Sequence, residues 1–170
     1  MNNEVLFSER QSFKQWWLWL ILLGINLLFI LGAIKQIIGG QQFGDKPMSN
    51  EGLLIATILT ILLTLLFASS RLETQVKNDG IYVRFFPFII SFKYYPWDKI
   101  SKSFVRKYRP LSEYGGWGLR FSFFGKGTAY NVSGDMGLQL VFNDQKKLLV
   151  GTKKPEELAE ALQKIGQVKM

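Results

Sequence analysis

The chain has 170 residues and a net charge of +8, and it contains neither cysteine nor histidine. It therefore has no thiolate nucleophile, no histidine base, no disulfide and no Cys/His zinc site. Residues 1–70 carry equal numbers of acidic and basic side chains, so all of the excess positive charge lies in residues 71–170.

Two apolar segments come first along the chain. Residues 16–34 and 53–70 contain no charged side chain, and at about 1.5 Å per helical residue each is long enough to cross a bilayer core of ~30 Å. Neither segment has the polar face of an amphipathic core helix. No small-residue cleavage site follows the first segment, which indicates a retained anchor rather than a signal peptide. We predict transmembrane helices over about 16–36 and 53–70.

The linker between these segments is short and rich in glycine, which predicts a transmembrane hairpin over residues 16–70 with both chain ends on one side. Basic residues near the membrane are more numerous on that side than in the linker, which carries Lys35 and Lys46. The positive-inside rule then places both termini in the cytoplasm. Residues 1–15 are interpreted as a cytoplasmic N-terminal tail of a two-span protein of the cytoplasmic membrane.

Small and polar residues within the two spans are candidates for helix packing. In the second helix three threonines share a face by their spacing, and in the first helix two glycines share a face with an asparagine close by. These residues are Gly24, Asn26, Gly32, Thr57, Thr60 and Thr64. The alternative is a polar conduction path, which is disfavoured because neither span holds an ionisable group.

From residue 71 onward the apolar residues alternate with polar ones, the pattern of β-strands. Turn signals such as Asp79-Gly80 separate the strands. The expected strands cover 72–77, 81–86, 88–95, 100–108, 119–124, 128–132, 137–142 and 146–151. A helix is expected over 155–166, with an apolar stripe of Leu158, Ala161, Leu162 and Ile165 that must cover another element. Such closely spaced strands predict an antiparallel sandwich or barrel.

Five stretches of this domain carry a family resemblance: NDGIYVRF, YYPWDKISKSFVRKY, GGWGLRF, AYNVSGDMGLQLVF and GTKKPEELAEAL. Together they resemble the bacterial membrane proteins that carry a pleckstrin-homology-like (PH-like) domain after a two-helix hairpin. The resemblance implies an α+β membrane protein, in which residues 71–170 form a seven-stranded antiparallel β-barrel or sandwich capped by a C-terminal helix. Phosphoinositide binding is not expected, because the first hairpin loop is Asn78-Asp79 and lacks a basic cluster.

Two features of the domain are candidate contact sites. One is a basic run, and the other is the glycine-rich loop around Trp117. The basic run attracts anionic lipid head groups, or it is a solvated strand edge protected by charge. Trp117 anchors a partner, or it is a core residue at the start of a strand. The residues concerned are Lys99, Lys102, Arg106, Lys107, Arg109 and Trp117.

No motif of catalysis or nucleic-acid binding is present. The acidic residues of the domain fall mainly in predicted turns and on the final helix, where turn chemistry and the helix dipole account for them. We therefore expect no enzyme activity, cofactor, metal or nucleic-acid partner. The sequence predicts a non-catalytic membrane-anchored binding or scaffolding module, with membrane lipids and a protein partner or a second copy as its contacts. The alternative is a small oligomeric transport or channel component, or an accessory subunit.

Overall fold

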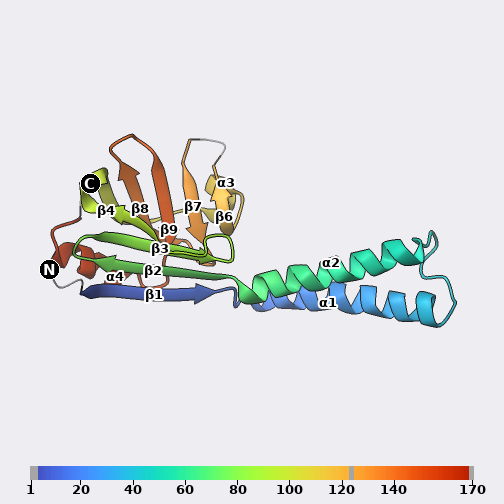
Figure 1. Ribbon diagram of the computed structural model, residues 1–170. Coiled ribbons are helices and arrows are strands. Elements are labelled where there is room, and N and C mark those ends of the chain that lie inside the picture. Colours follow the sequence, from blue (N-terminus) through green and yellow to red (C-terminus); the bar gives the residue numbers. More distant parts are fainter. Residues whose placement is uncertain (1–3, 123–124, 169–170) are drawn as a thin grey trace. The chain divides into compact units, whose positions relative to one another are not determined.

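The structure is a computed structural model that describes residues 4–122 and 125–168 (Figure 1). The chain divides into two compact units, a helical hairpin over Lys14–Ser69 and a β-rich unit formed by Met1–Phe13 and Ser70–Met170. The architecture is α+β, and each unit is described by itself.

The helical hairpin contains α1 (Trp16–Ala33), which continues into the π-helical turn η1 (Ile34–Ile38), and α2 (Asn50–Ser69). Both helices are long and apolar enough to cross a membrane. The first extends to Ile38 rather than residue 36, and the second begins at Asn50 rather than residue 53. Glu51 lies in the first turn of α2, where the helix dipole favours an acidic side chain.

One sheet of the β unit holds four antiparallel strands in chain order: β1 (Val5–Ser12), β2 (Arg71–Lys77), β3 (Gly80–Phe86) and β4 (Lys93–Pro96). The expected strand over 88–95 is corrected here, because only Lys93–Pro96 pairs with β3. The chain turns at the end of β3, where the N–H of Ile89 donates to the carbonyl of Phe85 at 2.7 Å. Residues 87–92 therefore form a loop between β3 and β4.

Strand β1 replaces the N-terminal tail expected from the sequence. It pairs with β2 along its length, from Phe7 opposite Val76 to Ser12 opposite Arg71. Its inward positions are Phe7, Glu9 and Gln11, so polar side chains occupy places where a sequence pattern would show apolar ones. As a result, the helical hairpin is inserted between two neighbouring strands of one sheet.

The second sheet holds β5 (Ile100–Lys107), β6 (Gly118–Phe121), β7 (Thr128–Asn131), β8 (Met136–Phe142) and β9 (Lys147–Gly151) in the order β5-β8-β9-β7-β6. The expected wholly antiparallel arrangement is wrong at one pair, because β7 and β9 run parallel. The chain reverses between β7 and β8, and β9 then fills the place between them. Of the strand expected over 119–124, residues 123–124 lie outside the described residues. The two sheets are open and do not form a closed barrel.

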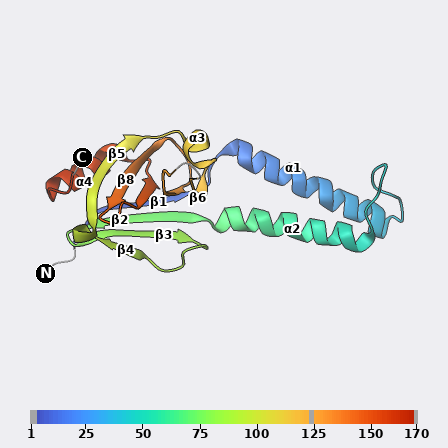
Figure 2. The same ribbon diagram turned by 90° about the horizontal axis from the view of Figure 1, so that it is seen from above.

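Three short helical segments complete the β unit: η2 (Trp97–Lys99), α3 (Pro110–Tyr114) and α4 (Pro155–Lys164). Helix α4 buries Leu158, Ala161 and Leu162 against β1, β5 and β8 (Figure 2). It ends at Lys164, earlier than the expected residue 166, so Ile165 of the expected apolar stripe follows the helix and is only half-buried. The core between the sheets includes fully buried Leu72, Val83, Phe85, Leu138 and Leu140.

Candidate functional site

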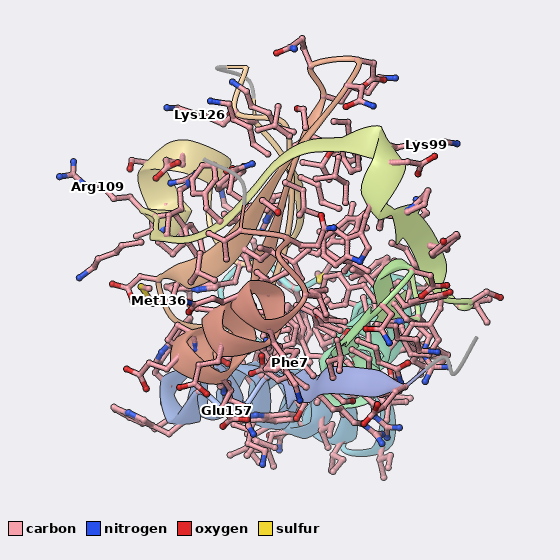
Figure 3. The ribbon with its side chains drawn as sticks, turned by 90° about the vertical axis from the view of Figure 1, so that its left-hand side faces the viewer. Phe7, Lys99, Arg109, Lys126, Met136 and Glu157 are labelled. Carbon is pink, nitrogen blue, oxygen red and sulfur yellow. The ribbon has the colours of Figure 1, made fainter. Side chains whose placement is uncertain are left out.

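The basic run of the sequence is divided by the geometry of β5. Lys99 precedes the strand and Arg109 follows it, and Figure 3 shows the two residues on opposite sides of the unit. The five basic residues therefore do not form one patch.

Two members of the run are engaged in ion pairs. The Arg106 guanidinium donates to both oxygens of Glu113, at 2.7 and 3.2 Å, and its Nε donates to Gln139 at 3.1 Å. Glu113 also accepts the backbone N–H of Arg109 at 2.8 Å, so it fastens α3 to β5. The hydrogen bond from Arg106 holds the pKa of Glu113 below its usual value. The Lys107 Nζ lies 3.2 Å from a carboxylate oxygen of Asp135.

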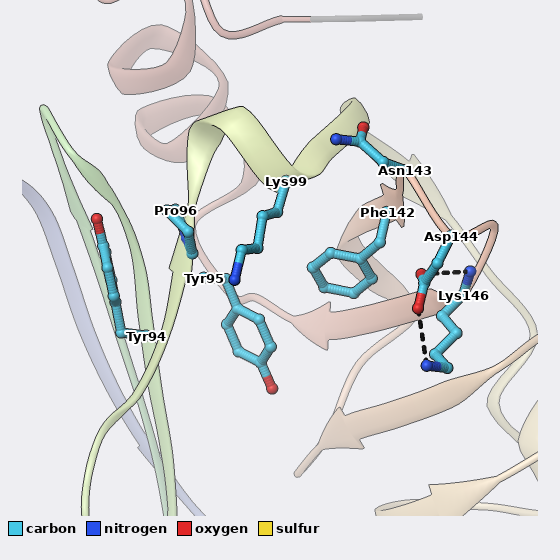
Figure 4. A pocket seen from close by; sticks show the side chains of 8 residues that line it. All are labelled: Tyr94, Tyr95, Pro96, Lys99, Phe142, Asn143, Asp144 and Lys146. Atoms are coloured by element: carbon cyan, nitrogen blue, oxygen red, sulfur yellow. Dashed lines mark hydrogen bonds and ion pairs between the residues drawn. The ribbon is translucent and has the colours of Figure 1, made fainter.

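The other three basic residues, Lys99, Lys102 and Arg109, are exposed and make no ion pair with another described residue. Lys99 lines an open cleft of about 400 Å³ at the hairpin formed by β8 and β9 (Figure 4). Lys102 lines a second cleft of about 470 Å³ at the same hairpin, together with Phe104 and Lys147.

We define the β8–β9 surface as these two clefts with their cations, Lys99, Lys102, Lys146 and Lys147. Sequence reasoning missed Lys146 and Lys147, although their adjacency at a predicted turn was a usable signal. Lys146 pairs with Asp144 at 2.7 Å. The other three lysines have no such partner among the described residues, so the surface is positively charged.

Aromatic rings form the floor of the first cleft. Tyr95 packs against Phe142 with the ring centroids 5.4 Å apart. Burial and the neighbouring Tyr130 raise the pKa of Tyr95, so its phenol stays neutral at physiological pH. A neutral hydroxyl, apolar rings and surrounding ammonium groups can bind an acidic segment that also carries apolar side chains.

Trp117 is half-buried in its glycine-rich loop. Its indole N–H donates to the carbonyl of Gly134 at 3.0 Å, and the next residue, Gly118, donates its N–H to Asn131 Oδ1 at 2.9 Å. Gly115, at φ 71°, ends α3 in the left-handed conformation that glycine favours. The loop is thus fastened to the strand end rather than projecting freely.

Three of the six residues expected to pack the two helices make contacts between α1 and α2. Asn26 Nδ2 donates to Thr64 Oγ1 at 2.6 Å across the hairpin, and it also donates to the carbonyl of Leu22. Thr57 Oγ1 donates within α2 to Leu53 at 2.8 Å and lies 3.4 Å from the carbonyl of Phe29 in α1.

The other three residues are used differently. Thr60 donates to Thr57 within its own helix. A Cβ at Gly32 would lie 2.7 Å from the ring of Phe43, so this glycine accommodates the linker. A Cβ at Gly24 would have no described atom of another segment within 4 Å, so Gly24 does not lie against α2.

No protein-family model matches the chain, and a search of curated proteins finds no matching sequence. Within residues 4–122 and 125–168, no group of three or more acidic side chains is arranged to hold a metal ion.

Proposed function

We propose that the chain is a non-catalytic, membrane-anchored binding module that presents a basic PH-like β domain at the cytoplasmic membrane face. The observation that carries this proposal is the insertion of the helical hairpin between β1 and β2, whose ends Ser12 and Arg71 are paired. Both spans continue into neighbouring strands of one sheet, so the β unit must stand on a single side of any bilayer that the hairpin crosses.

The surface of the hairpin supports a location in lipid. Large apolar side chains are exposed along both helices, among them Leu23, Leu27, Leu31, Ile55, Leu59 and Leu62. Soluble proteins rarely leave so large a continuous apolar surface in water, and the hydrocarbon core of a bilayer accommodates it at no cost. The positive-inside rule supports the cytoplasmic side for the β unit.

The PH-like assignment is part of the proposal. It is supported by the two packed sheets and by the amphipathic helix α4, which buries its apolar stripe at the end of the chain. The chain adds two features of its own to such a fold, the strand β1 from before the hairpin and the parallel pair of β7 and β9.

We further propose that the β8–β9 surface takes an acidic protein segment. Lys99 follows β4, whose last residue Pro96 is opposite Gly80 at the start of β3. The spans attach at the other end of this sheet, where Arg71 is opposite Phe86. Lys99 therefore lies at the end of the sheet away from the attachment points, which favours a protein partner over the lipid surface.

The polar groups within the spans support helix packing rather than conduction. Asn26, Thr57 and Thr64 use their donors on one another or on helix carbonyls. For this reason we propose a binding module and not a transport or channel component.

Purification of the tagged full-length protein in mild detergent tests the proposed partner. We expect an acidic protein to co-purify in stoichiometric amount at low salt, and to be lost at high salt and from a Lys99→Glu/Lys102→Glu variant. A Lys126→Glu/Lys153→Glu variant makes the same charge change elsewhere and should retain it. Equal retention by both variants, or enrichment of anionic lipid alone, would contradict a protein partner at this surface.

A further inference from the structure

We propose that the loop between β3 and β4, residues 87–92, inserts its apolar side chains into the lipid head-group region of the membrane that the hairpin crosses. This inference rests on the proposed membrane anchoring, and it adds a membrane contact made by the β unit itself. None of the sequence motifs pointed to it, because the segment was expected to be a strand.

The loop exposes apolar side chains that a folded unit in water would bury. The run FFPFIISF over residues 85–92 contains no charge. Phe86, Phe88 and Ile90 are exposed to 38%, 55% and 70%, whereas Phe85 in the preceding strand is fully buried. Three large exposed apolar side chains thus gather within five residues, Phe86 at the end of β3 and Phe88 and Ile90 in the loop itself.

Two aromatic side chains of the loop contact residues of β3. Phe88 rests edge-on against buried Phe85, with the ring centroids 5.7 Å apart, and the Arg84 guanidinium lies 4.7 Å from the ring centroid of Phe92. These contacts hold the base of the loop, and they leave Ile90 at its tip uncovered.

Strand register places the loop at the end of the sheet from which both spans leave. Ser12 is opposite Arg71, and Arg71 is opposite Phe86, the last residue of β3. Only Ser70 separates Arg71 from Ser69, where α2 ends. Two residues reach at most about 7 Å, and paired strands lie about 5 Å apart. Phe86, the residue before the loop, therefore lies within about 12 Å of Ser69 by chain connectivity and strand pairing alone.

The surroundings of the loop suit a lipid surface. The head-group layer is roughly 5–8 Å thick on each side of the hydrocarbon core, so a loop this close to a helix end reaches it. Exposed Arg71 and Lys93 flank the loop, where they can meet lipid phosphates. Figures 1 and 2 both show α3 and β6 at this end of the β unit. These elements contribute exposed Leu111 and Phe121.

The absence of cysteine from the sequence makes the experiment direct, because a single introduced cysteine can be labelled specifically. Full-length Ile90→Cys, Asn78→Cys and Leu59→Cys proteins are labelled with an environment-sensitive fluorophore and reconstituted into vesicles of phosphatidylcholine and phosphatidylglycerol. Quenching by lipids that carry a spin label near the head group or deep in the chain reports contact with each layer. Asn78 is the matched control, exposed in the turn at the opposite end of β3.

We expect head-group quenchers to reduce the Ile90→Cys signal at least twofold more than the Asn78→Cys signal, with a blue-shifted emission at Ile90 only. The Leu59→Cys label should respond to the deep quencher. If Leu59 responds and Ile90 matches Asn78, the loop inference is wrong while the anchor stands. If Leu59 does not respond to the deep quencher, the proposed anchor is wrong, and the loop inference falls with it.

Discussion

Glu9 and Gln11 are buried polar residues of β1, and their side chains hydrogen-bond to residues 151–153. Glu9 accepts from the Thr152 hydroxyl at 2.6 Å and from the Lys153 N–H at 2.9 Å. Gln11 Nε2 donates to the carbonyl of Gly151 at 2.8 Å. These bonds hold β1 against the end of β9 and the residues that follow it. An apolar side chain at position 9 or 11 could not form them.

Glu9→Ala should destabilise the β unit by about 1–3 kcal/mol, because the buried Thr152 hydroxyl and the partly buried Lys153 N–H lose their acceptor. The matched control is Arg10→Ala, whose side chain points to the other face, is 58% exposed and lies 3.6 Å from Glu73. An exposed ion pair contributes at most about 1 kcal/mol, so this variant should lose less stability than Glu9→Ala. Thermal unfolding of both purified variants in detergent makes the comparison. Equal stabilities would show that the Glu9 bonds do not hold β1.

The ion pair of Glu113 and Arg106 predicts a pH dependence. The pKa of Glu113 is held below its usual 4.5 in the folded protein by the Arg106 hydrogen bond. A lowered folded pKa adds stability above about pH 4.5, and this stability is lost as the pH falls through the folded pKa. The advantage of the wild type over Glu113→Gln should therefore be full near pH 7 and shrink below about pH 4.5.

Unfolding measured across this pH range checks the expectation, with Glu160→Gln on the exposed side of α4 as control. An advantage over Glu113→Gln that stays constant down to about pH 3 would contradict a stabilising role for the Glu113 carboxylate.

At the scale of elements, the pairing of Ser12 with Arg71 means that the helical hairpin stands where a short turn would otherwise connect β1 and β2. Replacing residues 13–70 by Asn-Gly should give a soluble, folded β unit, since this dipeptide is a favoured turn for a two-residue hairpin. Residues 71–170 alone lack β1, so β2 becomes an exposed edge and Glu9 no longer meets Thr152.

Size-exclusion chromatography and thermal unfolding of the two soluble chains test this prediction. The chain that retains β1 should be monomeric and melt cooperatively, and the chain without it should aggregate or melt at a lower temperature. Equal behaviour would show that β1 contributes little to the unit.

Elements with a continuous apolar run or a strong periodicity were predictable from sequence, and elements that depend on buried polar side chains or local turns were not. The two long apolar helices, the β2–β3 hairpin at Asp79-Gly80 and the amphipathic α4 all follow from residue patterns. Strand β1 was not predicted, because the polar residues Glu9 and Gln11 occupy buried positions where a strand pattern would show apolar ones. The run over 88–95 has strand-like composition, yet its first half forms a turn in which the N–H of Ile89 donates to the carbonyl of Phe85. The division of the basic run, and the joining of Lys99 with Lys146, depend on contacts between segments distant in sequence.

In the whole molecule, we propose that the two ends of the sheet formed by β1 to β4 make separate contacts, one with the membrane and one with a protein partner. The end with Ser12, Arg71 and Phe86 carries the spans and the apolar loop. The end with Gly80 and Pro96 carries Lys99 and leads to the β8–β9 surface. We propose that such a module binds its partner on the cytoplasmic side of the membrane that the hairpin crosses.

Cysteine accessibility decides whether the hairpin crosses the membrane with the β unit on the cytoplasmic side, as we propose. Single-cysteine Gln41→Cys, in the linker of the hairpin, and Asn78→Cys, in the β unit, are exposed to a membrane-impermeant maleimide in intact cells and after permeabilisation. We expect labelling of Gln41→Cys in intact cells, and of Asn78→Cys only after permeabilisation. Labelling of both positions from the same side would contradict it.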